Sequence, residues 1–306
     1  MAACTFHDSY WYCFANSGAM LLSSIGETVS PRLIEVLTAV GLGASFNPPL
    51  PFFGELVWPD RGLSQAFDIL GFDVEEHAVD APDPAPLDRL RDGPVIVGPL
   101  DMSHLVYNPG RPRGPGVDHY VVILAAESGR YRMHDPAGFA HVLLDGENLA
   151  RAWRADTIAY RRGHYRSWSS PRRRRSPSDD QIFDGAMTRF QALYRDAETR
   201  AAGNGECIGR DAHLALAKAV GRETLTPQLR GHLIFFALPL GAKRALDYAA
   251  FFERRAPKIA AMKRRQAELF GACHAALTAE AKPDAVRRFE DLATLEPEIK
   301  AAILAA

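Results

Sequence analysis

The chain changes its pattern at a Ser/Pro/Arg-rich stretch, "RSWSSPRRRRSPSDDQ", which runs from Arg166 to Gln181. Before it, short strand-like runs alternate with helical ones. After it, the sequence is rich in Ala, Leu, Arg and Glu and has few strand formers. We therefore expect an α+β domain over residues 1–166, a linker or exposed loop over 167–180, and an all-helical domain over 181–306.

Bulk composition excludes several classes of partner. The 306 residues are 47% hydrophobic and 24% charged, with a net charge of −1. This balance gives no reason to expect nucleic-acid binding, and no apolar run is long enough to span a membrane. Four cysteines, widely spaced and without a C-x-x-C pair, favour free thiols over a disulfide scaffold or a zinc site. We expect a cytoplasmic protein with no metal and no cofactor.

The first half is expected to form one helix followed by a mostly antiparallel sheet. Apolar residues recur at helical spacing after Cys13, and Gly26 is expected to end this helix. The Gly/Pro-rich "GLGASFNPPLPFFGE" predicts a loop. "GPVIVGPL" is typical of a buried strand, and "HYVVILAAE" and "RYRMHDP", joined by "SGR", predict a hairpin. "AHVLL" and "TIAYRRGHY" are expected to be further strands, with the helix "GENLARAWR" between them.

Cys13 stands where the first helix is expected to begin, after three aromatic residues in "YWYC". A thiol there faces the positive end of the helix dipole and unpaired backbone N–H groups, which favour the nucleophilic thiolate. A cysteine at a helix start is often only a small buried hydrophobe, however. A catalytic interpretation therefore needs a base and a group that orients the base.

His119 and Asp135 are the residues best placed to supply those two groups. His119 begins an expected strand in "GVDHYVVI", and Asp135 ends the next one in "MHDPAGF". An antiparallel hairpin brings these two positions to the same end of the sheet, where Asp135 could fix the tautomer of the imidazole. Cys13, His119 and Asp135 together predict a nucleophile, a general base and an orienting carboxylate.

A loop before His119, "DMSHLVYNPGRPRGPG", is a second candidate region. It could be a surface loop or could enter the site as a lid or substrate wall. In the second case Asp101 is available to bind a cationic amine, and Tyr107 to line the substrate site.

The order "CFANSGAMLLSSIG", "DHYVVI" and "HDPAG" resembles the papain-like cysteine enzymes, among them the peptidases that cleave bacteriocin leaders. The stretches "SSIGETVSPRLIEVLTAVGLGASF" and "GPVIVGPLDMSHLVYNPG", with the trailing helical domain, are similar to the family named for the H protein of butirosin biosynthesis. That protein moves an acyl group from a carrier-protein thioester to an amine. The resemblance covers residues 1 to about 166. It implies a papain-like fold with Cys13 as nucleophile, His119 as base and acid, and Asp135 as orienting residue.

One departure from the papain-like pattern concerns the oxyanion hole. Papain-like peptidases usually carry a glutamine about six residues before the cysteine, where this chain has His7. His7, Ser9 or a pair of backbone N–H groups including that of Cys13 would have to replace it. Losing one such donor costs about 2.7–4 kcal/mol of barrier, which an activated thioester tolerates better than an amide.

The expected activity is therefore acyl transfer from a carrier-protein or coenzyme A thioester to a small-molecule amine, in specialised metabolism. Two alternatives stay open: a peptidase or amidase with the same triad, and a catalytically silent papain-like binding module. The arginine run 172–175 could dock an acidic carrier protein. The sequence does not identify the acyl group, the amine or the oligomeric state.

Overall fold

The first folded unit is built on a six-stranded antiparallel sheet. A computed structural model describes residues 3–8, 11–47, 50–52, 54, 57–204, 207–222 and 225–306. The strands are β3 (Phe72–Val79), β4 (Val95–Asp101), β5 (Asp118–Glu127), β6 (Arg130–Asp135), β7 (Phe139–Asp145) and β8 (His164–Arg173). They lie in the order β3-β8-β4-β5-β6-β7, and each neighbouring pair is antiparallel. The α+β class and the antiparallel sheet that the sequence predicts are confirmed.

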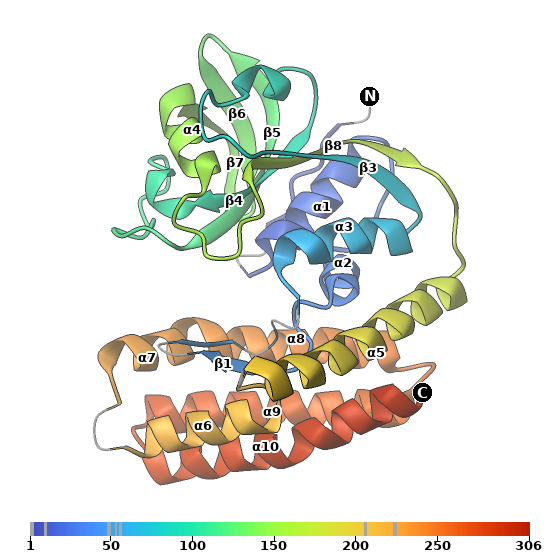
Figure 1. The fold of residues 1–306 in the computed structure, drawn as a ribbon, viewed down its shortest axis with the longest axis vertical. Coiled ribbons are helices and arrows are strands. Elements are labelled where there is room, and N and C mark those ends of the chain that lie inside the picture. Colours follow the sequence, from blue (N-terminus) through green and yellow to red (C-terminus); the bar gives the residue numbers. More distant parts are fainter. Residues whose placement is uncertain are drawn as a thin grey trace. The chain divides into compact units, whose positions relative to one another are not determined.

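Helices cover both faces of this sheet (Figure 1). They are α1 (Cys13–Ser23), α3 (Pro59–Ile69) and α4 (Gly146–Arg154). Helix α1 packs against β4 and β5, where the ring of Phe14 meets the edge of Tyr120. Helix α4 packs Trp153 into a core with Val121 and Ile123. Because side chains alternate along a strand, Tyr120 and Val121 point to opposite faces, so β5 is buried on both sides.

The second unit is helical, apart from a short hairpin. Its helices are α5 (Asp179–Asn204), α6 (Arg210–Gly221), α7 (Pro227–His232), α8 (Leu238–Phe252), α9 (Pro257–Thr278) and α10 (Lys282–Ala305). Residues 233–237 form a π-helical turn between α7 and α8. Helix α8 packs on α9, and α10 packs on both α9 and α6. The C-terminal helical region that the sequence predicts is confirmed.

The division of the chain differs from the one expected at residue 166. One unit comprises residues 1–34 and 59–177, and the other comprises 35–58 and 178–306, so the first boundary falls inside α2 (Pro31–Thr38). The connector that was expected to be a loop contains the hairpin β1 (Ser45–Asn47) and β2 (Leu50–Phe52). It belongs with the helices because the backbone N–H of Phe46 donates to the carbonyl of Cys207 at 2.9 Å, a pairing that lies outside the range of local sequence patterns.

The expectation of a linker or loop over residues 167–180 is wrong for residues 167–173, whereas residues 174–178 lie between β8 and α5 without regular structure. Strand β8 runs through Arg173 and pairs with β3 and β4, so half of this stretch lies inside the sheet. The arginines are stabilised there by acidic partners: Arg173 binds Glu27, and Arg174 binds Asp68. These pairs neutralise much of the run that was expected to dock an acidic carrier. The strand expected in "TIAYRRGHY" begins only at His164.

Candidate active site

Cys13 is the first residue of α1, as the sequence predicts. The rest of the helix is buried from Phe14 to Leu22, whereas Cys13 itself is partly exposed. The residue before the helix, Tyr12, makes no side-chain cap, so the N–H groups of the first turn are not satisfied by a capping side chain. Cys13 is therefore held by a buried helix while the residue itself is partly exposed.

The β5–β6 hairpin brings His119 and Asp135 together. His119 is the second residue of β5, Asp135 is the last residue of β6, and both are buried. The Nε2 atom of His119 lies 2.6 Å from Oδ1 of Asp135. This contact leaves Nδ1 as the imidazole nitrogen available to the thiol.

Asp135 is fixed by two further hydrogen bonds. The hydroxyl of Tyr107 donates to Oδ2 at 2.7 Å, and the backbone N–H of Ala137 donates to Oδ1 at 2.7 Å. Burial works to raise the pKa of Asp135, but the charge of His119 and these hydrogen bonds outweigh it and lower the pKa. The carboxylate therefore stays ionised and oriented against the imidazole. Burial, together with the same carboxylate, raises the pKa of Tyr107, which stays a neutral donor.

The side chain of His119 lies beside the Cys13 thiol, where each group acts on the pKa of the other. Burial raises the pKa of Cys13, and the hydrogen bond and charge of His119 oppose that rise. Burial also disfavours charge on His119, but Asp135 and the cysteine together raise the pKa of the imidazole well above its usual value. The two groups titrate as a pair, since a thiolate and an imidazolium in contact stabilise each other.

Two more groups act on the thiol from β5. The charge of the Asp118 carboxylate raises the pKa of the thiol, whereas hydrogen bonding by the backbone of Tyr120 lowers it. The Asp118 carboxylate accepts a hydrogen bond from the hydroxyl of Tyr160 at 2.6 Å, and that hydroxyl lies 3.1 Å from the hydroxyl of Tyr120. Asp118 stands beside His119 in the sequence and could have been found there. Tyr160 could not, since it is 42 residues away from Asp118 in the chain.

The arrangement has the three parts that nucleophilic acyl transfer requires. Cys13 offers a thiol that could act as nucleophile, His119 an imidazole that could act as its base, and Asp135 a carboxylate that holds this imidazole. The structure brings these three predicted residues together, with Tyr107 as a fourth that contacts Asp135. Tyr107 thus positions the carboxylate, whereas the sequence led us to expect a substrate contact.

The other predicted substrate residues do not join this cluster. Asp101 is buried, and its carboxylate accepts hydrogen bonds from the N–H and the hydroxyl of Ser103, from the N–H of Gly116 and from the hydroxyl of Thr157. Burial works against its charge, but these bonds lower the pKa of Asp101. Four donors fill the roughly four acceptor positions of a carboxylate, so Asp101 organises its loop and is not free to bind an amine as expected.

The two oxyanion candidates before the helix stay predictions. His7 is partly buried on the segment 3–8, which runs beside α1: the thiol of Cys4 donates to the carbonyl of Met20, and the N–H of Thr5 donates to Ser23. Ser9 lies outside the described residues. The groups named above that lower the pKa of the Cys13 thiol are His119 and the backbone of Tyr120.

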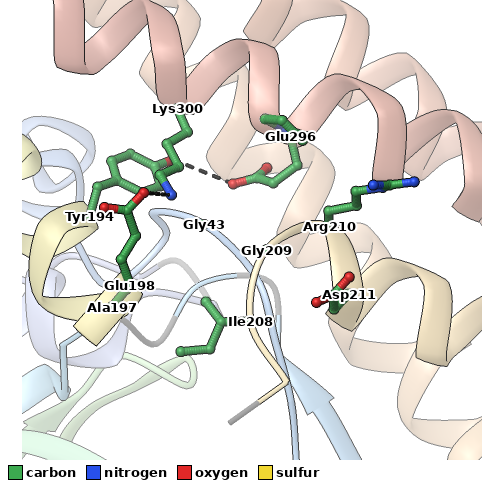
Figure 2. Close-up of a pocket in the computed structure, with 11 residues that line it drawn as sticks. Gly43, Tyr194, Ala197, Glu198, Ile208, Gly209, Arg210, Asp211, Glu296 and Lys300 are labelled. Carbon is green, nitrogen blue, oxygen red and sulfur yellow. Dashed lines mark hydrogen bonds and ion pairs between the residues drawn. The ribbon is translucent and has the colours of Figure 1, made fainter. Parts of the chain in front are cut away.

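A separate cavity of about 200 Å³ lies in the helical unit (Figure 2). Figure 2 shows Glu296 facing Tyr194, whose hydroxyl lies 3.4 Å from the carboxylate, and Lys300 paired with Glu198. Among the described residues, those that line this cavity include no cysteine, serine or histidine. We therefore do not place the nucleophilic chemistry there.

In the part of the chain that the structure describes, no group of three or more His, Cys, Asp and Glu side chains is placed to hold a metal ion. Within the same residues, no helix combines the length and apolar character needed to cross a membrane.

Comparison with known proteins places the chain in a family. Residues 202–304 match the family described as the YobF C-terminal domain. Over 267 residues the chain is 39% identical to the uncharacterized protein YobF of Bacillus subtilis (strain 168), and the match covers 86% of each chain. The chain belongs to the YobF family. In this YobF-family protein, the Cys13, His119 and Asp135 cluster precedes the domain from which the family takes its description.

Among solved structures, the chain is similar to the peptidase domain of Streptococcus ComA, a bifunctional ABC transporter involved in a quorum-sensing pathway. The TM-score is 0.34 at 15% identity, covering 50% of this chain and 93% of that one. This similarity to a papain-like peptidase domain is weak.

Proposed function

We propose that this YobF-family chain is a cysteine-dependent acyltransferase in which Cys13 carries the acyl group. The observation that supports the proposal is a continuous series of contacts from the Cys13 thiol through His119 and Asp135 to Tyr107. A partly exposed cysteine at one end of a buried, hydrogen-bonded series is the arrangement of an activated nucleophile. A core cysteine needs no such partners.

In the first step, the Cys13 sulfur attacks the carbonyl carbon of an acyl thioester. His119 takes the thiol proton, and the tetrahedral intermediate collapses when the carbon–sulfur bond of the donor breaks. The imidazolium then gives this proton to the departing thiolate. Backbone N–H groups of the first turn of α1 are the donors nearest in the chain to the nucleophile for stabilising the oxyanion.

In the second step, an amine attacks the acyl-Cys13 thioester. His119, now neutral, accepts a proton from the attacking nitrogen and returns one to the Cys13 sulfur as it departs. The product is an amide, and the thiol is regenerated. Water would give hydrolysis by the same route, so the difference between a transferase and a peptidase or amidase is the nucleophile admitted at this point.

The proposed donor is a carrier-protein or coenzyme A thioester. A thioester is already activated, so it makes a smaller demand on the oxyanion hole than an amide does. The usual glutamine donor is replaced here by His7 in the sequence. Since each such donor contributes about 2.7–4 kcal/mol, a chain without it is better suited to thioesters than to amides.

The test is to incubate the chain with a panel of acyl thioesters of coenzyme A and N-acetylcysteamine and to record its intact mass. We expect an acyl adduct that forms on wild type, is absent from Cys13→Ala, and is discharged by amines faster than by water. A His119→Ala variant should form it at least about a hundredfold more slowly, the contribution typical of a general base.

Cys4→Ala is the matched control, because Cys4 is another partly buried thiol in the same unit. Burial raises its pKa to about 11 despite a hydrogen bond with Ser23, and its removal should leave adduct formation unchanged. An adduct lost equally fast to water would identify a hydrolase. An adduct that persists in Cys13→Ala, or no adduct together with a Cys13 that resists alkylation, would contradict the proposal and favour a silent binding module.

A further inference from the structure

Asp118 is an acidic group at the nucleophile that the steps above do not use. It is the first residue of β5, next to His119, and its side chain is partly exposed. The hydroxyl of Tyr160 donates to its Oδ2 atom at 2.6 Å. Within the described residues, Oδ1 receives no hydrogen bond, so half of the carboxylate is free to bind a donor.

Rigid neighbours hold this carboxylate in place. The Tyr160 hydroxyl lies 3.1 Å from that of Tyr120, whose side chain is fully buried. The Tyr120 ring packs against Trp168, and a Cβ at Gly98 would lie only 2.3 Å from that ring. The backbone of Tyr120 acts on the pKa of the Cys13 thiol, and its hydroxyl contacts the Tyr160 hydroxyl that holds Asp118.

The negative charge of Asp118 opposes ionisation of the Cys13 thiol. Its carboxylate raises the pKa of Cys13 and so disfavours the thiolate. Some carboxylates of this unit are matched by cations, as Asp60 is by Arg162 and Glu76 by Arg166. Among the described residues, no lysine or arginine lies within 4.0 Å of the Asp118 carboxylate. An unpaired negative charge that opposes the nucleophile is explained if a positive charge on the substrate completes the site.

We infer that Asp118 is the ammonium-binding subsite for the acceptor, and that the acceptor is a primary amine that arrives in its protonated form. This inference rests on the proposed function. The free Oδ1 atom accepts a hydrogen bond from the ammonium and places its nitrogen beside acyl-Cys13. The subsite also explains why an amine would be chosen over water, which brings no charge to Asp118.

The three protons of the docked ammonium are accounted for as follows. One is released to solvent when the nitrogen becomes a free amine. A second passes to His119 as the carbon–nitrogen bond forms, and from His119 to the Cys13 sulfur as the carbon–sulfur bond breaks. The third stays on the amide nitrogen. No oxidant, reductant or further reactant is needed.

The first test uses thiol reagents of different charge and needs no turnover. Cys13 is treated with (2-aminoethyl) methanethiosulfonate, which is a cation, and with methyl methanethiosulfonate, which is neutral. Rates are read at the Cys13 peptide by mass spectrometry. Because the same thiolate attacks both reagents and displaces methanesulfinate from each, the ratio of their rates does not depend on the pKa of the thiol. In Asp118→Asn, which keeps an oxygen acceptor for Tyr160, the ratio should fall about fivefold to tenfold, and less at high salt.

Glu127→Gln is the matched control, because it removes a carboxylate from the other end of the same strand, roughly 30 Å along β5. Its ratio should equal that of wild type. A ratio unchanged in Asp118→Asn, with the variant folded by its thermal unfolding, would overturn the inference.

The second test uses the acyl adduct, where it forms. Discharge by ethylenediamine, a cation at neutral pH, is compared with discharge by methoxyamine, which is neutral. The rate ratio should fall by about the same factor in Asp118→Asn. An adduct that forms but shows no change of ratio refutes the subsite alone. A reagent ratio that changes without any adduct supports the subsite and refutes the proposed function.

Discussion

Asp135→Asn is the substitution that most directly tests the candidate triad. The side-chain oxygen of the introduced asparagine would keep the hydrogen bonds from His119 and the Ala137 N–H, which in wild type are 2.6 and 2.7 Å long. The amide NH₂ would face the Tyr107 hydroxyl, which can rotate and accept from it. The change therefore removes a negative charge from a buried position and leaves the shape nearly intact.

The expected magnitude follows from the distance between the two charges. The centres of an imidazolium and a carboxylate in this contact are about 4 Å apart, and at an effective dielectric constant of about 20 they attract by about 4 kcal/mol. Part of this is recovered by relaxation and by the retained hydrogen bond, so we expect a loss of about 2–4 kcal/mol. At about 1.4 kcal/mol per factor of ten, the thiolate–imidazolium state becomes about 30-fold to 1,000-fold rarer.

The assay measures the second-order rate constant for alkylation of Cys13 by iodoacetamide, followed by mass spectrometry of the Cys13 peptide. It is run at about pH 7.5, where a thiol with the ordinary cysteine pKa is mostly protonated. Tyr107→Phe serves as a graded comparison, because it removes one hydrogen bond from Asp135 but keeps the charge, and it should slow alkylation less than about tenfold. Thermal unfolding verifies that both variants are folded. A folded Asp135→Asn protein alkylated at the wild-type rate would refute the electrostatic argument, and with it the role given to Asp135.

Three further outcomes are expected. Arg244→Met should lower the free energy of unfolding by about 3–5 kcal/mol in urea denaturation, because it leaves the buried Glu35 carboxylate without the guanidinium 2.7 Å away. Adding Glu35→Leu to the same chain should recover most of this loss. Burial and the charge of Lys263 lower the pKa of His213 to about 3, so native His213 stays neutral where the unfolded state is protonated, below about pH 6.5. The free energy of unfolding of wild type should therefore fall by about 2 kcal/mol between about pH 7 and pH 5 through this group. His213→Leu should not show this loss. The raised pKa of His119 stabilises the native state fully below about pH 6.5, and this stabilisation is lost as the pH rises through the pKa of His119 in the folded state. The difference in Tm between wild type and His119→Gln should therefore narrow toward alkaline pH. A difference that widened would contradict the raised pKa of His119.

The elements that the sequence predicted well are those whose signals are local. The helix "GENLARAWR" coincides with α4 (Gly146–Arg154), whose cap Asp145 accepts from the N–H of Asn148 at 2.9 Å. The hairpin of β5 and β6 follows from two apolar runs and the turn between them. Cys13, His119 and Asp135 were found because a helix start and a hairpin fix three positions without knowledge of the rest of the fold.

The elements that the sequence missed depend on partners far away in the chain. Most of strand β8 was predicted to be a linker because it is rich in serine and arginine and contains Pro171, a residue depleted in strands. It forms because Arg166, which is buried, is paired with Glu76 on β3, and because Trp168 is buried against the sheet. The sequence predicts a solvent-exposed arginine here because the acidic partner of Arg166 is 90 residues away in the chain. Tertiary pairing, not local preference, decided this strand.

The two aspartates at this end of the sheet differ in a property that the sequence does not predict, the number of hydrogen-bond donors around each carboxylate. Asp101 and Asp118 are direct register partners on β4 and β5, and the sequence led us to expect amine binding by Asp101 alone. In the fold, four donors saturate the Asp101 carboxylate, whereas Tyr160 is the described donor to Asp118. A carboxylate whose acceptor positions are filled has no capacity left for a ligand, and one that is half-filled beside a nucleophile does. Counting the donors around each carboxylate therefore moves the amine site from Asp101, which the sequence favoured, to its partner across the strand.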